Sequence, residues 1–204
     1  MLATDTRTRI MDIAQDAILL KGFTSTSIEE IVTEAGITKG GFFYHFHDKN
    51  SLAHALIERH IEVEDGIFDD LLARAAELHE DPLHAALIGL KLLAELIDDM
   101  PNGHPGCIVA TVAYQERLFD ARVREVNRRA VLGWRKRFRA MFEEIAAVYP
   151  PNDAVDLDAL GDFVSTVVEG GIVLSKSLGD PAICGRQIML LRSYVKLLFS
   201  PRTY

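Results

Sequence analysis

The segment from Thr38 to Lys49, TKGGFFYHFHDK, holds the side chains best suited to contact a polyanion. Lys39, Tyr44, His45 and Lys49 can each donate a hydrogen bond to a phosphate oxygen. Helices that begin near Thr38 and Asp48 add partial positive charge through their first backbone amides. This combination of donors predicts a phosphate-binding surface.

Two adjacent glycines, Gly40 and Gly41, lie within the same segment. Glycine costs a helix about 1 kcal/mol relative to alanine, so this pair indicates a requirement other than helicity. Close approach of the backbone to another surface is such a requirement. Phe42 and Phe46 are four residues apart, and we expect both to face a small core.

The elements that position this segment are short helices. Ser27 and Glu30 match the S-x-x-E capping box, and the helix that they begin is expected to end at Gly36. Thr38 then caps the next helix, and a supporting helix precedes both over about residues 5–20. Two short helices joined by a tight turn indicate a helix-turn-helix, whose second helix is suited to the DNA major groove.

The rest of the chain also predicts helices, because apolar residues recur every three or four positions without sustained alternation. Asp48 caps a helix whose apolar repeat extends beyond Leu71 and is expected to link two domains. Later helices are expected between Pro82 and Pro101, from Cys107, and over about 120–148, 154–178 and 181–198. The fold class is therefore all-α with about nine helices. The expected domains are 4–64, with the helix-turn-helix at about 27–46, and a larger helical domain over 65–204.

Composition limits the other possibilities. The chain has 204 residues, of which 49% are hydrophobic, so it can bury a core without disulfides. Cys107 and Cys184 are far apart and predict neither a disulfide framework nor a cysteine zinc site. No apolar stretch reaches the ~20 residues that a membrane helix needs, so we expect a cytoplasmic protein. The net charge of −8 repels DNA overall, which leaves room only for a small DNA-binding surface.

The stretch GFTSTSIEEIVTEAGITKGGFFYHFHDKNSL, from Gly22 to Leu52, resembles the signature of the TetR family of regulators. The resemblance covers about residues 6–60, and beyond them it is architectural only. It implies a homodimer, a palindromic DNA operator, and a small-molecule ligand that releases a repressor from DNA. By position, it implies phosphate contacts from Thr26 and Ser27.

The same resemblance implies a recognition surface over residues 38–44 and a contact from Lys49 to the DNA backbone. The family often has tyrosine where this chain has Phe43, so one phosphate-contacting hydroxyl is absent there. The neighbouring Tyr44 is placed to substitute for it. The DNA-binding residues expected are Thr26, Ser27, Thr38, Lys39, Gly40, Gly41, Phe43, Tyr44, His45 and Lys49.

A more basic run lies outside this region, from Arg117 to Arg139. By charge alone it would be the nucleic-acid site. Its apolar residues recur at helical spacing, which favours a long helix with one buried face and arginines on the solvated face. A site for an anionic ligand or a partner is the alternative interpretation of this run.

Enzyme and metal motifs are weak. His79-Glu80 with His84 approaches the zinc-protease pattern, but the second histidine is one residue too far and Pro82 interrupts the helix. Ser193 and Lys196 match S-x-x-K without its companion motifs. No phosphate-binding loop or dinucleotide fingerprint occurs. We therefore expect no catalytic residue, no metal site and no cofactor.

The larger domain is expected to bind a small, mostly apolar effector and to dimerise. The ligand-binding candidates are Cys107, Val109, Tyr114, Trp134, Phe138 and Phe163. The dimer-interface candidates are Val167, Gly171, Leu174, Ile188, Leu191 and Tyr194, since the last two helices can pair with a symmetry mate. The alternative is a helical interaction protein or ligand carrier without specific DNA binding.

Overall fold

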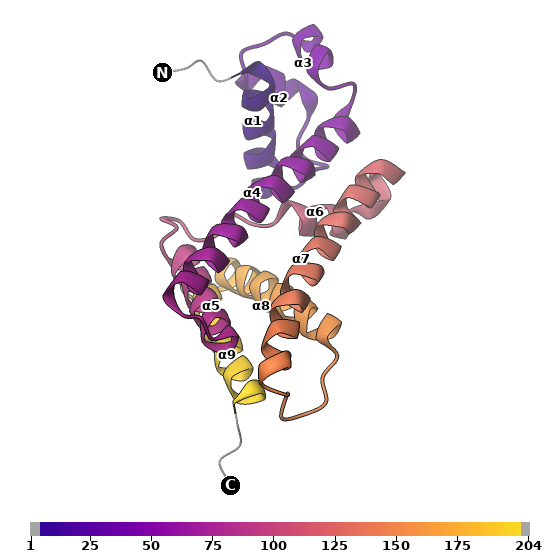
Figure 1. Ribbon diagram of the computed structural model, residues 1–204. Helices are drawn as coiled ribbons and strands as arrows, with labels where there is room; N and C mark the ends of the chain where they lie inside the picture. The colour runs from indigo at the N-terminus through magenta and orange to yellow at the C-terminus, as the bar shows by residue number, and fades with distance from the viewer. Residues whose placement is uncertain (1–4, 201–204) are drawn as a thin grey trace. The chain divides into compact units, whose positions relative to one another are not determined.

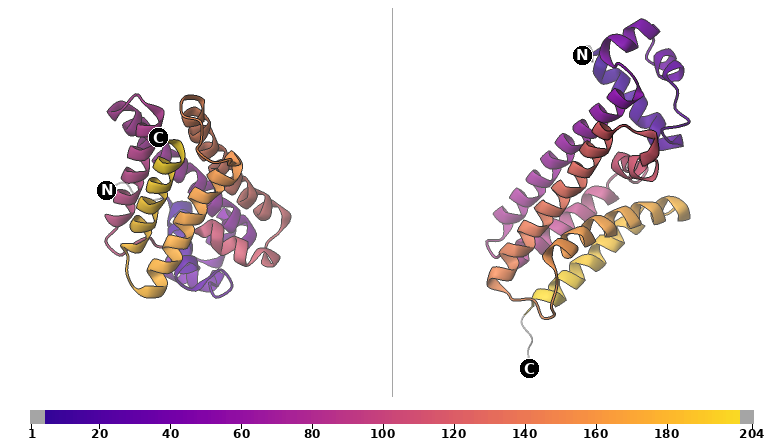
Figure 2. Two further views of the ribbon diagram at one scale, coloured as in Figure 1. Left: turned by 90° about the horizontal axis from the view of Figure 1, so that it is seen from below. Right: turned by 90° about the vertical axis from the view of Figure 1, so that its right-hand side faces the viewer.

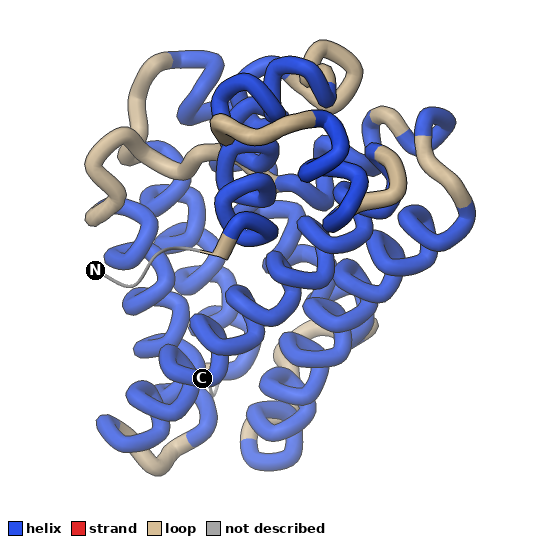
Figure 3. The backbone as a smooth tube through the Cα atoms, turned by 90° about the horizontal axis from the view of Figure 1, so that it is seen from above, coloured by secondary structure: helices blue, strands red, loops and turns tan. Residues whose placement is uncertain are grey.

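A computed structural model describes residues 5–200, and in this range the chain is helical with no strand (Figures 1 and 3). This confirms the all-α prediction. The predicted domain limits at Thr4 and Tyr204 lie outside the described residues. The helices are α1 (Thr6–Lys21), α2 (Ile28–Glu34), α3 (Lys39–His45), α4 (Lys49–Leu78), α5 (Pro82–Asp98), α6 (Ile108–Tyr114), the 3₁₀ turn η1 (Glu116–Leu118), α7 (Ala121–Val148), α8 (Leu157–Leu178) and α9 (Ile183–Phe199).

Local sequence sets the ends of the helices around the predicted motif. The Ser27 hydroxyl accepts a hydrogen bond from the Glu30 amide at 3.1 Å, and the Thr38 hydroxyl accepts one from the Gly41 amide at 3.1 Å. Gly36, between α2 and α3, has a φ of 63°, a conformation that favours glycine. The predicted caps and turn are therefore confirmed.

The chain divides into two compact units, and the first consists of residues 5–63 and 105–131. Figure 1 shows α1, α2 and α3 grouped with the first turns of α4. The Phe23 and Phe119 rings lie 4.4 Å apart between centroids, and the Asn50 side chain accepts a hydrogen bond from the Asp120 amide at 3.2 Å. The first unit therefore includes a segment that the predicted boundary at 64/65 assigned to the other domain.

The second unit consists of residues 64–104 and 132–200. Helix α9 packs against both α5 and α8, and Figure 2 shows α8 and α9 side by side. The α8–α9 contact is close at Gly171, where an added Cβ would lie 2.9 Å from the Cα of Cys184. Large side chains that fill the core of this unit include Leu90, Phe142, Ile145, Val164, Ile188 and Phe199.

The basic run of α7 is paired with acidic residues within each unit. In the first unit, Arg129 pairs with Glu58. In the second, the Arg135 guanidinium forms a bidentate ion pair with the Asp162 carboxylate, with N···O distances of 2.8 and 2.7 Å. Further pairs join Arg137 to Asp65 and Asp69, and Arg139 to Glu143 and Asp158. These pairs agree with a solvated, ion-paired helix face.

None of the helices within residues 5–200 combines the length and the apolar character that a membrane crossing requires.

Candidate nucleic-acid interface

Helix α3 has a buried face and an exposed face. Phe42 is fully buried and Phe46 is 3% exposed, as the spacing predicted. On the outer face, Tyr44 is 85% exposed and Phe43 is 50% exposed. The aromatic side chains on this outer face are therefore available to a partner outside the chain.

The two glycines of α3 are not required by the fold itself. A Cβ added to Gly40 would lie 3.7 Å from the Thr38 hydroxyl, and one added to Gly41 would lie 3.6 Å from Ile37, which are ordinary contacts. Neither glycine has a positive φ. Since alanine fits both positions and favours a helix, the glycines point to a surface that approaches the backbone from outside.

Lys39 lies at the start of α3 and is exposed. Its ammonium group is 2.5 Å from a carboxylate oxygen of Glu29, and the hydrogen bond from Lys39 lowers the pKa of that carboxyl. Exposed ion pairs of this kind contribute little to stability. Lys39 can therefore exchange Glu29 for a phosphate at little cost to the fold.

Ser27 and Thr38 are exposed caps of α2 and α3. Each hydroxyl oxygen accepts a backbone amide, which leaves the hydroxyl proton to donate. His45, the last residue of α3, is partly buried, and its ring lies 5.0 Å from the Tyr44 ring between centroids. These positions are compatible with the predicted phosphate contacts.

Thr26 and Lys49, two of the predicted phosphate contacts, form hydrogen bonds within the first unit. Thr26 is fully buried, and its hydroxyl donates to the Gly22 carbonyl at 3.0 Å. The Lys49 ammonium donates to the Phe23 carbonyl at 2.8 Å and the Thr26 carbonyl at 2.6 Å. It also lies 4.3 Å from the centre of the Phe23 ring. Burial lowers the pKa of Lys49, and both side chains hold the turn between α1 and α2.

Two donors that the sequence analysis left out lie near α3. The Arg7 guanidinium lies over the Phe46 ring, 5.2 Å from its centre, and lines a surface groove with His45. His47 follows α3 with its side chain 93% exposed. Arg7 lies in the first turn of α1, so only the packing of α1 against the loop after α3 brings it to this place.

The predicted ligand-binding residues are divided between the two units. Cys107, Val109 and Tyr114 belong to the first unit, whereas Trp134, Phe138 and Phe163 belong to the second. Tyr114 is 81% exposed, and the Cys107 sulfur caps α6 by accepting the Ala110 amide at 3.4 Å. In the second unit, Phe163 is partly exposed and packs edge-on against Tyr194.

Half of the predicted dimer-interface residues serve the core of their own chain. Gly171 contacts Cys184, while Ile188 and Leu191 are buried in the second unit. These three are therefore packed within their own chain. Leu174 and Tyr194 are nearly half exposed, and Val167 is partly buried. Helices α8 and α9 expose further apolar side chains that the sequence analysis did not name, and together with Leu174 and Tyr194 we call them the exposed apolar face. They are Val173, Leu178, Leu190 and Leu197.

Comparison with known proteins places the family signature of the chain in its first unit. Residues 10–56 match the family described as bacterial regulatory proteins, tetR family. The chain is 27% identical to the HTH-type transcriptional regulator YxaF of Bacillus subtilis over 86% of this chain and 87% of that protein. It is 30% identical to the HTH-type transcriptional regulator TtgR of Pseudomonas putida, over 61% of this chain and 49% of the relative. The match to TtgR thus spans about half of that relative's length.

Solved structures share the fold along almost the whole chain. A TetR-family regulator from Agrobacterium tumefaciens superposes with a TM-score of 0.76 at 21% identity, covering 96% of this chain and 98% of its own. A TetR regulator from Chloroflexus aurantiacus gives a TM-score of 0.76 at 22% identity, covering 95% and 96%. These proteins are regulators rather than enzymes.

Proposed function

Because the chain belongs to the TetR family of DNA-binding transcriptional regulators, we propose that it is a repressor that binds a palindromic operator as a homodimer. A small, mostly apolar effector releases it from DNA. The observation that carries the proposal is the outer face of α3, which exposes Tyr44 beside two glycines that the fold does not need. Such a protein acts in the cytoplasm, with the DNA that it binds.

In the proposed complex, α3 lies in the major groove. Gly40 and Gly41 let the helix backbone approach the DNA closely, while Lys39 and Tyr44 donate to phosphates. Lys39 gives up Glu29 on binding, so a local positive charge appears where the pair was neutral. This small surface binds DNA although the whole chain carries a net charge of −8.

Two-fold symmetry sets the operator geometry. A dimer whose recognition helices lie about 34 Å apart reads two half-sites separated by one turn of DNA. Helix α4 carries residues of both units, so a ligand that favours one orientation of α4 changes this spacing and the affinity for DNA. The ligand-binding candidates of the second unit are Trp134, Phe138 and Phe163, and a ligand that leaves DNA affinity unchanged contradicts this mechanism.

The first test is binding of the purified protein to the intergenic DNA that flanks its own gene, measured across a salt series. We expect sequence-selective binding that weakens steeply as salt rises, because phosphate contacts release counterions. Lys39→Ala should lower the affinity and reduce the salt dependence by about one ion. Tyr44→Ala should lower the affinity as well. Gly40→Ala should weaken DNA binding while it raises helix stability by up to about 1 kcal/mol.

The matched control is Lys91→Ala, which removes an exposed lysine of α5 that pairs with Glu95 in the second unit. This variant should bind DNA like the wild type. Selective binding that survives all three α3 substitutions would show that α3 is not the recognition helix. Absence of selective binding would favour a helical ligand carrier.

The exposed apolar face of α8 and α9 is the proposed dimer surface. Leu190→Glu, at a position that is 62% exposed, should convert the dimer to a monomer without loss of helix content, because it places a charge in an apolar contact. Light scattering coupled to size-exclusion chromatography measures the change. Leu78→Glu, at a 65% exposed position at the end of α4, is the control and should stay dimeric. A Leu190→Glu protein that remains dimeric contradicts this interface.

A further inference from the structure

A cluster of three side chains that ligate metals lies where α4 gives way to α5. His79 follows the last residue of α4, Asp81 caps α5, and His84 lies in the first turn of α5. One ligand atom from each residue lies within 4.8 Å of those of the other two. All three residues belong to the second unit, so the cluster lies within one compact body.

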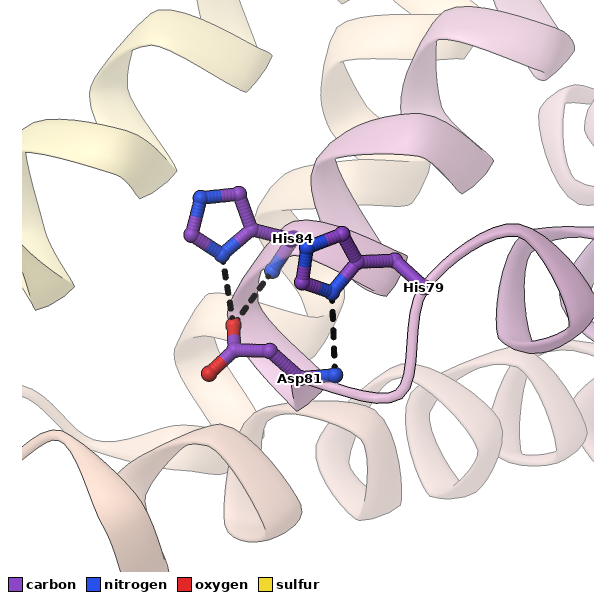
Figure 4. A group of neighbouring side chains, drawn as sticks. All are labelled: His79, Asp81 and His84. Atoms are coloured by element: carbon purple, nitrogen blue, oxygen red, sulfur yellow. Dashed lines mark hydrogen bonds and ion pairs between the residues drawn. The ribbon is translucent and has the colours of Figure 1, made fainter.

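The two imidazole rings turn the same nitrogen toward Asp81 (Figure 4). Nδ1 of His84 lies 2.7 Å from Oδ1 of Asp81, and Nδ1 of His79 accepts the Asp81 backbone amide at 3.0 Å. The rings are stacked with their centroids 4.6 Å apart and their planes 18° apart. Both Nδ1 atoms therefore contact Asp81, that of His84 at the carboxylate and that of His79 at the backbone amide.

We propose that His79, Asp81 and His84 form a binding site for a divalent transition-metal ion of the zinc class. Nδ1 of each histidine and one carboxylate oxygen of Asp81 supply three ligands, and water completes the coordination. Imidazole nitrogen with carboxylate oxygen is a donor set that Zn²⁺, Co²⁺ and Ni²⁺ accept. The site is independent of the DNA-binding function proposed above.

The geometry requires only small movements of exposed side chains. Ligands at 2.0–2.2 Å from a tetrahedral ion are about 3.4 Å apart, so the widest pair must close by up to about 1.4 Å from the present 4.8 Å limit. Both histidines are exposed, so their rings can rotate. The ion replaces the contact between His84 and Asp81 and the amide contact of His79. Each imidazole then binds as the tautomer that carries its proton on Nε2.

The Asp81 carboxylate is held in position by a tyrosine outside the cluster and by a backbone amide of the first turn of α5. Its Oδ2 accepts a hydrogen bond from the Tyr149 hydroxyl at 2.5 Å, and its Oδ1 accepts the His84 amide at 2.9 Å. These two hydrogen bonds fix the orientation of the Asp81 carboxylate. In known metal sites, outer-shell hydrogen bonds orient the ligating side chains in the same way.

The helical zinc motif requires both histidines on one face of one helix. His79 lies outside α4 and α5, so that requirement does not apply to it. The loop reverses between the helices and stacks the His79 ring on the His84 ring. The proposed site therefore differs from the helical zinc motif, which the sequence does not match because Pro82 interrupts it.

The test uses the full chain without a histidine tag, freed of metal and titrated with Zn²⁺ by calorimetry and with Co²⁺ by visible absorption. We expect one ion per chain to bind at this site. His79→Gln and His84→Gln should each weaken binding by more than about tenfold, because the loss of an outer-shell partner alone costs that much. Asp81→Asn should also weaken binding while it keeps the cap, since asparagine caps a helix as well as aspartate does.

Glu80→Gln is the matched control, because it removes an exposed carboxylate from the same loop but no ligand. It should leave the affinity within about a factor of two of wild type, because salt screens the attraction of an exposed charge for the ion. Circular dichroism of each variant checks that the fold is retained. Failure of wild type to bind, or equal binding by the wild type and all three ligand variants, would overturn the proposal. An equal loss in Glu80→Gln would do so too, because it would show general attraction to an acidic loop.

Discussion

Replacing Lys49 by methionine should lower the free energy of unfolding of the first unit by about 3 kcal/mol, taking the lower end of the 1.5–3 kcal/mol range for each of two hydrogen bonds to a charged group. The ammonium group bridges the carbonyls of Phe23 and Thr26 at 2.8 and 2.6 Å, and methionine leaves both without this donor. The favourable contact with the Phe23 ring is lost as well. Chemical denaturation of the full chain, with a probe in the first unit, measures the difference.

Lys39→Met is the matched substitution, because Lys39 is exposed and pairs only at the surface with Glu29. Lys39→Met should leave the free energy of unfolding unchanged and weaken DNA binding. The main effect of Lys49→Met should instead be a lower free energy of unfolding. DNA binding by the folded Lys49→Met protein then shows whether Lys49 also contacts a phosphate, besides its contacts to backbone carbonyls. If Lys49→Met kept its stability but lost DNA binding, the result would support the phosphate contact that the sequence predicts for Lys49.

The second large effect is a pH dependence at Glu64, which lies in the part of α4 that belongs to the second unit. Burial raises the pKa of this carboxyl from 4.5 to about 7. The hydrogen bond from Trp134 opposes the rise, while Asp65 and Glu169 add to it. Because the folded state holds the proton more tightly, this group's stabilising contribution is complete below pH 4.5 and is lost as the pH rises through 7.

The difference of about 2.5 pH units corresponds to about 3 kcal/mol at pH 8.5, since each unit of pKa is 1.36 kcal/mol. Glu64→Gln, which is neutral at every pH, should therefore match the wild type in stability near pH 4 and exceed it by up to this amount at pH 8.5. Denaturation at both pH values measures the difference, with Glu77→Gln, an exposed position on α4, as the control. A wild-type advantage at pH 8.5 would show that the ionised carboxylate is stabilised in the folded chain.

Both effects concern ionisable side chains that are at least partly buried within their own unit. Lys49 fixes the turn that precedes the recognition motif, and Glu64 lies beside Trp134, one of the ligand-binding candidates. The metal-binding cluster lies farther along, at the end of α4. Lys49, Glu64 and the cluster can be tested separately, because their variants report on stability, on pH dependence and on metal affinity.

The sequence by itself determined the helices and the recognition motif. Ser27, Thr38 and Asp81 lie three residues before the amides that they cap, so the helix starts depend on neighbours in the chain. The buried Phe42 and Phe46 follow from helical spacing alone. The family signature is contiguous, and the match over residues 10–56 therefore needed no knowledge of the packing.

Only the tertiary structure decided which partner each side chain meets. A lysine near a DNA-binding motif is equally able to donate to a phosphate or to a carbonyl, and packing of α4 near the turn assigned Lys49 to the Phe23 carbonyl. Gly171 indicates a close approach, but the pattern does not say that Cys184 of the same chain is the neighbour. Helical periodicity reports which face is buried and not what covers it, because residues distant in sequence supply the cover.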